Sequence, residues 1–251
     1  MIVVTGDTHG DFSRLSNKHI KDLIGEDDYV IIAGDCGLCW KNDDTFKYWL
    51  DFLKTRKFRT LFIDGNHENF DMLNSYKVDK WHGGKVHHIV KDKVIHLMRG
   101  QVFNIEDKKI FTFGGGTSID IQGGLLDRNN PNFREQRARA NELGLPYRVI
   151  GESWWEQEMP SNLELKECIV NLEAHNWQVD YIITHSICSK RLNDLNTVIR
   201  LTGKVGDKLT DFLNIIEERA IFKRWYFGHY HVDWNMDEKH CALYKQLLEV
   251  M

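Results

Sequence analysis

Short apolar runs that end in glycine or in a polar cluster recur along the chain and constrain its fold more than any other feature. They are rich in β-branched and aromatic residues, which is typical of buried strands. The six runs cover residues 2–4, 29–33, 60–63, 110–113, 180–183 and 225–227. Stretches with a helical period lie between several of these runs, at residues 44–56, 162–174 and 207–220. This alternation of strand and helix predicts an α/β fold.

The remaining segments suggest how the chain is organised. Residues 232–236 and 241–247 are predicted to form a closing hairpin around a polar turn. No Pro-rich or Ser-rich linker and no repeat is present, so we expect a single domain over residues 1–251. Residues 114–160 hold glycine clusters and few periodic apolar positions, and are predicted to form an irregular, cap-like insert.

Charge and hydropathy exclude several classes of protein. The 251 residues include 33 Lys+Arg and 37 Asp+Glu, for a formal net charge of −4. This balance argues against a generic nucleic-acid clamp, which is normally strongly basic. No apolar run approaches the roughly 18 residues that a membrane span requires, and the chain opens with a predicted strand instead of a signal peptide. We therefore expect a cytoplasmic protein without a membrane partner.

Polar side chains follow five of the predicted strands at the point where each strand ends. The residues concerned are Asp7, His9, Asp35, Asn66, His67, His185, His229 and His231. Ligands of open α/β sheets collect beyond the carboxyl ends of the strands. Carboxylate, imidazole and amide oxygen are ligands for divalent metals such as Mn²⁺, Fe²⁺ and Zn²⁺. The pattern therefore predicts a metal site, and two metals about 3.5 to 4 Å apart could clamp a phosphoryl group during its transfer.

These motifs, taken in order, resemble those of the calcineurin-like metallophosphoesterase superfamily. They are Asp7-x-His9, Gly34-Asp35, Gly65-Asn66-His67-Glu68, His185 and Gly228-His229-x-His231, and together they extend over residues 6–231. Each is a weak signal alone, but five in the same order form a strong one. The resemblance implies a metallophosphoesterase-type sandwich of two mixed β-sheets flanked by α-helices. It also implies a dinuclear-metal-dependent phosphatase or phosphodiesterase in which a metal-bound hydroxide attacks a phosphate ester.

The resemblance also implies roles for individual residues. One metal would be bound by Asp7, His9 and His231, and the other by Asn66, His185 and His229. Asp35 would bridge the two metals, and His67 would act on the leaving group as a general acid or a hydrogen-bond donor. The two divalent ions would be drawn from Mn, Fe, Zn and Ni. The implied substrate is a phosphate ester, with nucleotides and phosphoproteins among the candidates.

The second motif departs from the protein Ser/Thr phosphatases of the superfamily. Leu38 stands where those enzymes carry an Asp that orients the catalytic His, and Cys39 where they carry a phosphate-binding Arg. Asp64 likewise replaces an Arg. These departures argue against a dedicated protein phosphatase and leave open what orients His67. They also motivate an alternative hypothesis, a non-catalytic metal-binding scaffold or phosphate-binding module on the same fold.

Cysteine spacing raises a third hypothesis. Cys36-x-x-Cys39 could be half of a zinc site or a redox pair, although no second Cys pair accompanies it. The five cysteines, which are odd in number and irregularly spaced, favour buried or incidental thiols over a disulfide framework.

The predicted insert supplies candidates for substrate binding. Arg128, Arg134, Arg148, Trp154 and Trp155 could recognise an anionic substrate by bidentate and stacking contacts. The alternative is a solvated helix face, balanced by neighbouring glutamates, together with a Trp pair in the core. The seven histidines outside the motifs have no pattern around them, so we expect them at the surface.

Overall fold

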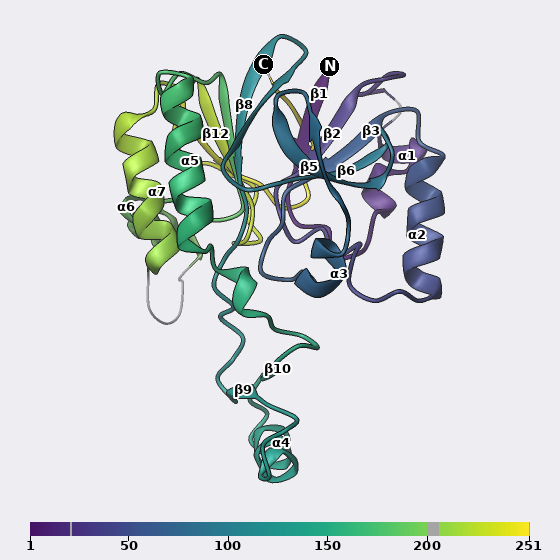
Figure 1. Ribbon diagram of the computed structural model, residues 1–251, viewed down its shortest axis with the longest axis vertical. Helices are drawn as coiled ribbons and strands as arrows, with labels where there is room; N and C mark the ends of the chain where they lie inside the picture. The colour runs from purple at the N-terminus through teal and green to yellow at the C-terminus, as the bar shows by residue number, and fades with distance from the viewer. Residues whose placement is uncertain (21, 200–205, 251) are drawn as a thin grey trace.

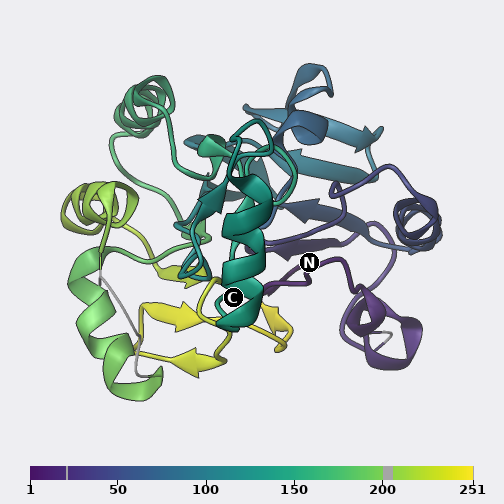
Figure 2. The ribbon, with the colours of Figure 1, turned by 90° about the horizontal axis from the view of Figure 1, so that it is seen from below.

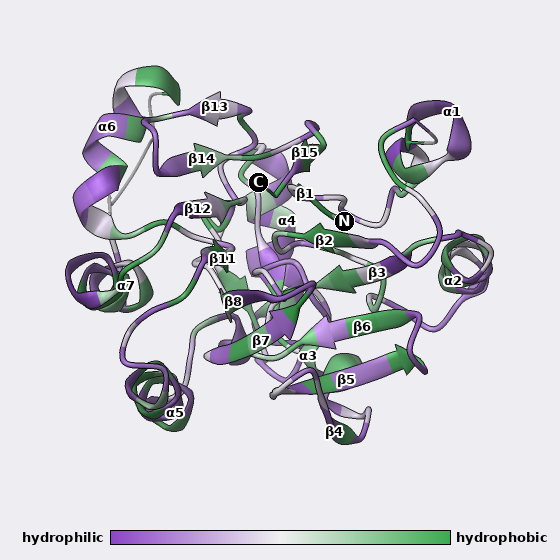
Figure 3. Cartoon of the chain, turned by 90° about the horizontal axis from the view of Figure 1, so that it is seen from above, coloured by the Kyte–Doolittle hydropathy of each residue, from purple (hydrophilic) through white to green (hydrophobic). Residues whose placement is uncertain are grey.

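Two β-sheets face each other at the centre of the molecule, and helices cover their outer sides (Figure 3). The computed structural model describes residues 1–20, 22–199 and 206–250. Both sheets are mixed, with parallel strands in the middle and antiparallel strands at the edges. The architecture is therefore the sandwich of two mixed sheets flanked by helices that the sequence predicted.

The first sheet has seven strands in the order β15-β1-β2-β3-β6-β5-β4. Their bounds are Ile2–Thr5 (β1), Tyr29–Ile32 (β2), Arg59–Phe62 (β3), Val78–Trp81 (β4), Gly84–Val90 (β5), Val94–Leu97 (β6) and Leu248–Glu249 (β15). Strands β1, β2, β3 and β6 are parallel. Their side chains are buried on both faces, which explains why the sequences of β1 and β2 read as almost continuous apolar runs.

The second sheet has six strands in the order β13-β14-β12-β11-β8-β7. Their bounds are Gln101–Ile105 (β7), Lys108–Phe113 (β8), Tyr181–Thr184 (β11), Arg224–Phe227 (β12), Trp234–Asn235 (β13) and His240–Ala242 (β14). The predicted closing hairpin corresponds to β13 and β14, but its second strand is shorter than predicted. The chain beyond Ala242 instead crosses over to pair with β1 as β15.

Three apolar clusters hold these layers together. The central cluster lies between the sheets and includes Ile31 and Leu61 from the first sheet and Ile183 and Tyr226 from the second. The outer cluster of the first sheet is covered by α1 (Asn17–Ile20) and α2 (Asp44–Lys54). The outer cluster of the second sheet is covered by α5 (Asn162–Ala174), α6 (Ser189–Ile199) and α7 (Lys208–Arg219). A further short helix, α3 (Phe70–Asn74), follows the third motif.

The six predicted strands all form, with bounds shifted by one or two residues, but strands β4 to β7 were not predicted. Strand β4 is an edge strand with mostly exposed residues, so it lacks a buried apolar run. In β5 and β6, the paired residues His87 and His96 interrupt the apolar pattern. Edge position and buried polar side chains thus hide strands from a search for apolar runs.

Residues 114–160 form an arm that leaves the body below the sheets and returns to it (Figure 1). The arm is less irregular than predicted: β9 (Leu125–Leu126) pairs in parallel with β10 (Arg148–Val149), and α4 (Phe133–Glu142) lies at its far end. Helix α4 buries only Phe133 and Ala140, so its sequence carries no apolar stripe. Seen from below, α4 crosses the centre of the view, in front of the sheets (Figure 2).

Three histidines outside the motifs, expected at the surface, are buried: His87, His96 and His240. His96 Nε2 lies 3.2 Å from Asp64 Oδ1, and His240 Nε2 lies 3.0 Å from a Glu217 oxygen. Each of these contacts joins segments far apart in the sequence, so the sequence offers no local signal for it. Among the helices that the structure describes, none has the length and apolar character needed to cross a membrane.

Candidate metal centre

The predicted ligands all lie in the loops that follow the parallel strands of the two sheets. Asp7 and His9 follow β1, and Asp35 follows β2. Asn66 and His67 follow β3, His185 follows β11, and His229 and His231 follow β12. The carboxyl ends of parallel strands meet at one edge of a sheet, and here the two sheets bring their edges together.

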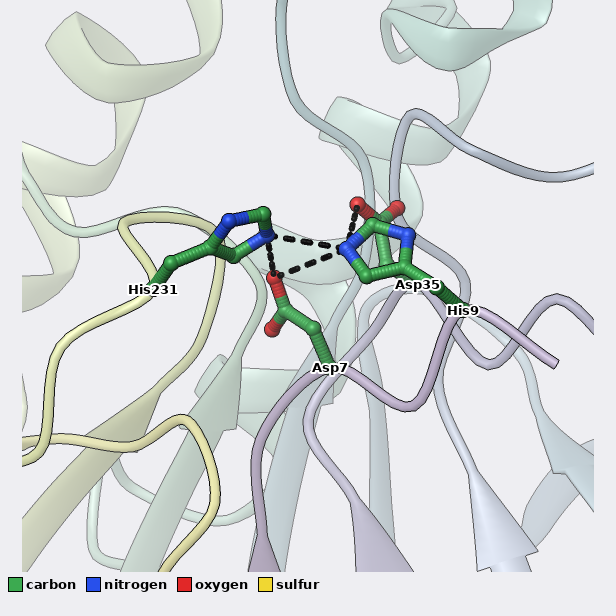
Figure 4. A group of neighbouring side chains, drawn as sticks. All are labelled: Asp7, His9, Asp35 and His231. Atoms are coloured by element: carbon green, nitrogen blue, oxygen red, sulfur yellow. Dashed lines mark hydrogen bonds and ion pairs between the residues drawn. The ribbon is translucent and has the colours of Figure 1, made fainter. Parts of the chain in front are cut away.

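Four of these residues form the closest cluster: Asp7, His9, Asp35 and His231 (Figure 4). One ligand atom from each lies within 4.8 Å of the others. The Nε2 atoms of His9 and His231 are 2.8 Å apart, and His231 Nε2 is 3.1 Å from Asp7 Oδ2. Two imidazole nitrogens and two carboxylates are a ligand set that Zn²⁺, Mn²⁺ and Fe²⁺ accept.

The chemistry of this cluster fits a bound cation. The carboxylates of Asp7 and Asp35 are buried, and buried charge of one sign requires a compensating partner. Two neutral imidazoles that face each other through Nε2 can share only one hydrogen. A divalent cation would accept all four ligand atoms and neutralise both carboxylates.

His185 faces Asp35 from the opposite side. Its Nδ1 donates to the backbone oxygen of Ala33 at 3.0 Å, which turns Nε2 toward Asn66 Oδ1 at 3.2 Å and Asp35 Oδ1 at 3.3 Å. Both oxygens only accept, so Nε2 must carry a proton or meet a cation. Burial alone would lower the pKa of His185, but the Asp35 carboxylate raises it to about 9.

Asp35 therefore lies between the two predicted ligand sets. Its Oδ1 faces His185, while its Oδ2 lies 3.9 Å from His9 Nε2. The His229 ring lies 4.8 Å from that of His185, and burial lowers the pKa of His229 to about 4. A neutral imidazole at this position has a lone pair available for a metal.

The backbone of the site is held in unusual conformations. Four predicted ligands have positive φ: His9 (46°), Asp35 (45°), His229 (70°) and His231 (50°). Non-glycine residues seldom adopt this region, and functional sites often do. Glycine is needed next to them, because a Cβ at Gly65 would lie 2.1 Å from Asp35 Oδ1, and one at Gly228 would lie 2.3 Å from Asp7 Oδ1.

His67 lies beside the first cluster, with its ring edge-to-face against His9 at 5.0 Å. Its backbone N–H donates to Asp35 Oδ1 at 2.7 Å. Arg148 Nη2 lies 2.8 Å from His67 Nε2, and the same guanidinium donates to both Asp120 oxygens, at 2.9 and 2.6 Å. Burial and the Arg148 charge lower the pKa of His67 to about 4, so the imidazole is neutral at pH 7.

The predicted substrate-binding residues of the arm have different positions. Only Arg148 contacts the proposed catalytic residue, His67. The Arg128 side chain is 59% exposed and paired with Glu152, and Arg134 is exposed on α4. Trp155 is buried and Trp154 half-buried. For Arg134 and Trp155, these positions agree with the solvated-helix and core alternative, whereas Arg128 lies between β9 and α4, outside the helix.

Several residues near the site carried no sequence signal. Asn66 Nδ2 donates to Ser118 Oγ at 3.3 Å, and Ser118 Oγ donates to Glu158 Oε2 at 2.6 Å. This chain of hydrogen bonds from the arm fixes the amide so that Asn66 Oδ1 faces His185. Asp64, beside Gly65, is buried and paired with Arg99 through Nη2 at 2.5 Å. The sequence marks Asp64 only as a departure from the protein Ser/Thr phosphatases, and its partner Arg99, 35 positions away, carries no signal.

Cys36 and Cys39 are buried behind the second motif, and both thiols are free. Burial raises the pKa of each thiol, so neither is a ready thiolate for metal binding or redox chemistry. Leu38 is also buried. These positions agree with the buried-thiol interpretation.

A cavity of about 590 Å³ opens onto the cluster. Its walls include the proposed ligands His9, Asp35 and Asn66, together with His67 and Asp120. This volume lies within the range of small-molecule sites, about 300 to 1,000 Å³. The predicted metal ligands are therefore accessible to a ligand of that size.

Comparison with known proteins points to one family. A family model described as calcineurin-like phosphoesterase matches residues 1–233. No curated protein matches the chain significantly. Among solved structures, a Staphylococcus aureus protein assigned as a 5′-nucleotidase, in complex with alpha-ketoglutarate, is similar at 14% identity and a TM-score of 0.46. The match covers 97% of this chain and 48% of that one, so the chain spans about half the length of that structure.

Proposed function

The chain belongs to the calcineurin-like phosphoesterase family, and on this basis we propose that it hydrolyses phosphate esters with two divalent metal ions. The observation that carries the proposal is the clustering of ligand atoms from Asp7, His9, Asp35 and His231 within 4.8 Å. Asp35 also faces His185 and thus has a position suited to a bridging ligand. Asn66, His185 and His229 complete the proposed second set, and the metals are drawn from Mn, Fe, Zn and Ni.

Bound cations would supply a hydroxide nucleophile near neutral pH and would offset the charge of the phosphate. The protein's own residues prepare the site for this chemistry. The buried Asp35 carboxylate accepts the His67 backbone N–H, which keeps the third motif close to the first. Because the pKa of His67 is lowered to about 4, its ring is neutral and carries one hydrogen. Arg148 donates to Nε2, so we propose that this hydrogen lies on Nδ1 and is donated to the leaving oxygen.

Arg148 and Asp120 are proposed to position His67. The arginine donates to the imidazole at 2.8 Å, and Asp120 holds the guanidinium with two hydrogen bonds. An Arg bound in this bidentate way is well oriented, and its positive charge lies next to the proposed leaving-group site. The arm thus supplies an Asp and an Arg, the two residue types missing at Leu38 and Cys39. This supports an enzyme over a non-catalytic scaffold.

A metal panel crossed with two esters tests the proposal. The protein is stripped with chelator, reloaded with Mn²⁺, Fe²⁺, Zn²⁺ or Ni²⁺, and assayed with p-nitrophenyl phosphate and bis-p-nitrophenyl phosphate. We expect hydrolysis to depend on metal and the preferred ester to distinguish a monoesterase from a diesterase. Full activity in chelator would refute the metal mechanism, whereas a metal-loaded protein inert to both esters would favour the scaffold.

A further inference from the structure

A second pocket, of about 410 Å³, adjoins the proposed metal centre. It lies between the loop after β2 and the beginning of α2. His9 and His67 line both this pocket and the cavity over the cluster, so the two spaces meet at these side chains. A molecule bound over the metal ligands could therefore extend past His67 into this pocket.

Three large aromatic side chains lie in the walls of this pocket. They are Trp40, Phe46 and Trp49, and all three are only partly buried. Phe46 and Trp49 pack on one side against the outer cluster of the first sheet and line the pocket with the rest of their surface. Partly exposed rings beside a polar site are suited to binding an organic group.

The rings are held in place by contacts behind the pocket. Trp49 packs edge-to-face against the buried Phe12, with centroids 5.5 Å apart. Trp40 packs against Trp155 of the arm at 5.8 Å, and its backbone oxygen accepts from Asn69 Nδ2 at 2.9 Å. Rings fixed in this way lose little conformational freedom when a ligand stacks on them.

Polar side chains share the walls with the three rings: His9 and His67 on the side of the cluster, and Lys41, Asp43 and Thr45 near the beginning of α2. The Asp43 carboxylate accepts from the backbone N–H groups of Thr45 and Phe46, so it caps α2. Lys41 is exposed, and its positive charge favours an electron-rich ring or an anionic substituent. The pocket is therefore suited to a flat ring that carries polar atoms at its edge.

We propose that this pocket binds an aromatic ring carried by the alcohol portion of the phosphate ester, either a nucleobase or an aryl group. The inference rests on the proposed function, since His67 is there assigned to the leaving oxygen. The group bonded to that oxygen would continue past His67 and stack on Trp40, Phe46 and Trp49. Hydrolysis itself is unchanged: the bond from phosphorus to the alcohol oxygen breaks, and water supplies one oxygen to the phosphate and one proton to the alcohol.

Two matched pairs of esters test the proposal in the metal-loaded protein. Adenosine 5′-monophosphate and ribose 5-phosphate share the same primary alcohol and differ in the base. Benzyl phosphate and cyclohexylmethyl phosphate differ in the flatness of the ring. We expect kcat/KM to favour the aromatic member of at least one pair by about ten-fold, the size typical of stacking on aromatic side chains. The pair with the larger ratio separates a nucleobase from an aryl group.

Variants of Trp40 test whether the preference for aromatic esters depends on the pocket. Trp40→Leu keeps apolar bulk but removes the ring, so the ratio of kcat/KM between the aromatic and non-aromatic esters should fall to near one. Trp40→Phe should restore much of the preference. The control is Trp81→Leu, the same exchange at a partly buried Trp on the edge strand β4 that lines neither cavity. Its preference should match that of the unchanged protein.

Failure of this inference can be told apart from failure of the proposed function. Equal hydrolysis of both members of each pair, or a preference that survives Trp40→Leu, would overturn the pocket assignment and leave the phosphoesterase intact. If no ester is hydrolysed, the proposed function fails, and calorimetric titration with adenosine and benzyl alcohol then tests the pocket separately. Binding of one of them that Trp40→Leu weakens would support the pocket, and no binding of either would overturn it.

Discussion

The arm has a near part, whose side chains contact the site, and a far part, most of whose side chains face solvent, and the two parts contain similar residues in opposite surroundings. Arg148, in the near part, is 7% exposed, pairs with Asp120 and contacts His67. Arg128, in the far part, is 59% exposed and pairs with Glu152. Exposed ion pairs contribute about 0 to 1 kcal/mol, whereas a charged group buried against a site alters its neighbours directly. An arginine in the arm is therefore informative only when its contacts are known.

The largest loss of activity is expected for a substitution in the ligand cluster at the strand ends. The effects of substitutions in both parts of the arm are compared with it. Asp35→Asn should reduce activity to background and remove bound metal, because Asp35 faces both proposed ligand sets. Metal content is measured by mass spectrometry alongside hydrolysis of p-nitrophenyl phosphate. Retention of both metals with full activity would mean that Asp35 does not bridge them.

A smaller effect is expected at His67, which Arg148 of the near part contacts. His67→Gln should retain the metals and lower kcat by about 10² to 10⁴, the range for loss of a proton-transfer or donor group. The measurement is steady-state kinetics with metal content determined on the same samples. Loss of metal together with activity would instead identify His67 as a ligand.

A substitution of Arg148 tests whether the near part of the arm contributes to activity. Arg148→Met should lower kcat by about 10 to 100-fold, as is usual for residues that orient a functional group. It should also raise the pKa of His67 above about 4, because a neighbouring positive charge disfavours the imidazolium, while burial, the larger cause of the lowered pKa, remains. The pKa is measured by NMR titration of the metal-free protein. An unchanged kcat and an unchanged His67 pKa would mean that Arg148 has only a structural role. Arg148→Lys keeps the positive charge, so its kcat and His67 pKa should lie between those of Arg148→Met and the unchanged protein.

The smallest effect is expected in the far part. Arg128→Met should leave kcat and KM unchanged and should alter the free energy of unfolding by no more than about 0.5 kcal/mol. Denaturant unfolding and the same kinetic assay are the measurements. A loss of activity close to that of Arg148→Met would contradict this expectation and show that Arg128 also acts on the site.

Much of the fold and of the candidate site could be predicted from local pattern. Each of the six predicted strands is an apolar run, and each predicted ligand directly follows one of them, so strand and ligand are visible together. The misses have two causes. Strand β4 and helix α4 expose a polar surface, whereas the histidines buried in β5 and β6 depend on neighbours far along the chain. Neither leaves an apolar period in the sequence.

By itself, the sequence determined the α/β class and the placement of the seven proposed metal ligands and His67 at the ends of strands, because these depend on short local motifs. Only the tertiary structure decided which residues support that site. Arg148 and His67 are 81 positions apart, and Ser118 and Asn66 are 52 apart. Folding brings such side chains together through the packing of the arm against the sheets. Contacts of this kind have no signature in either local sequence.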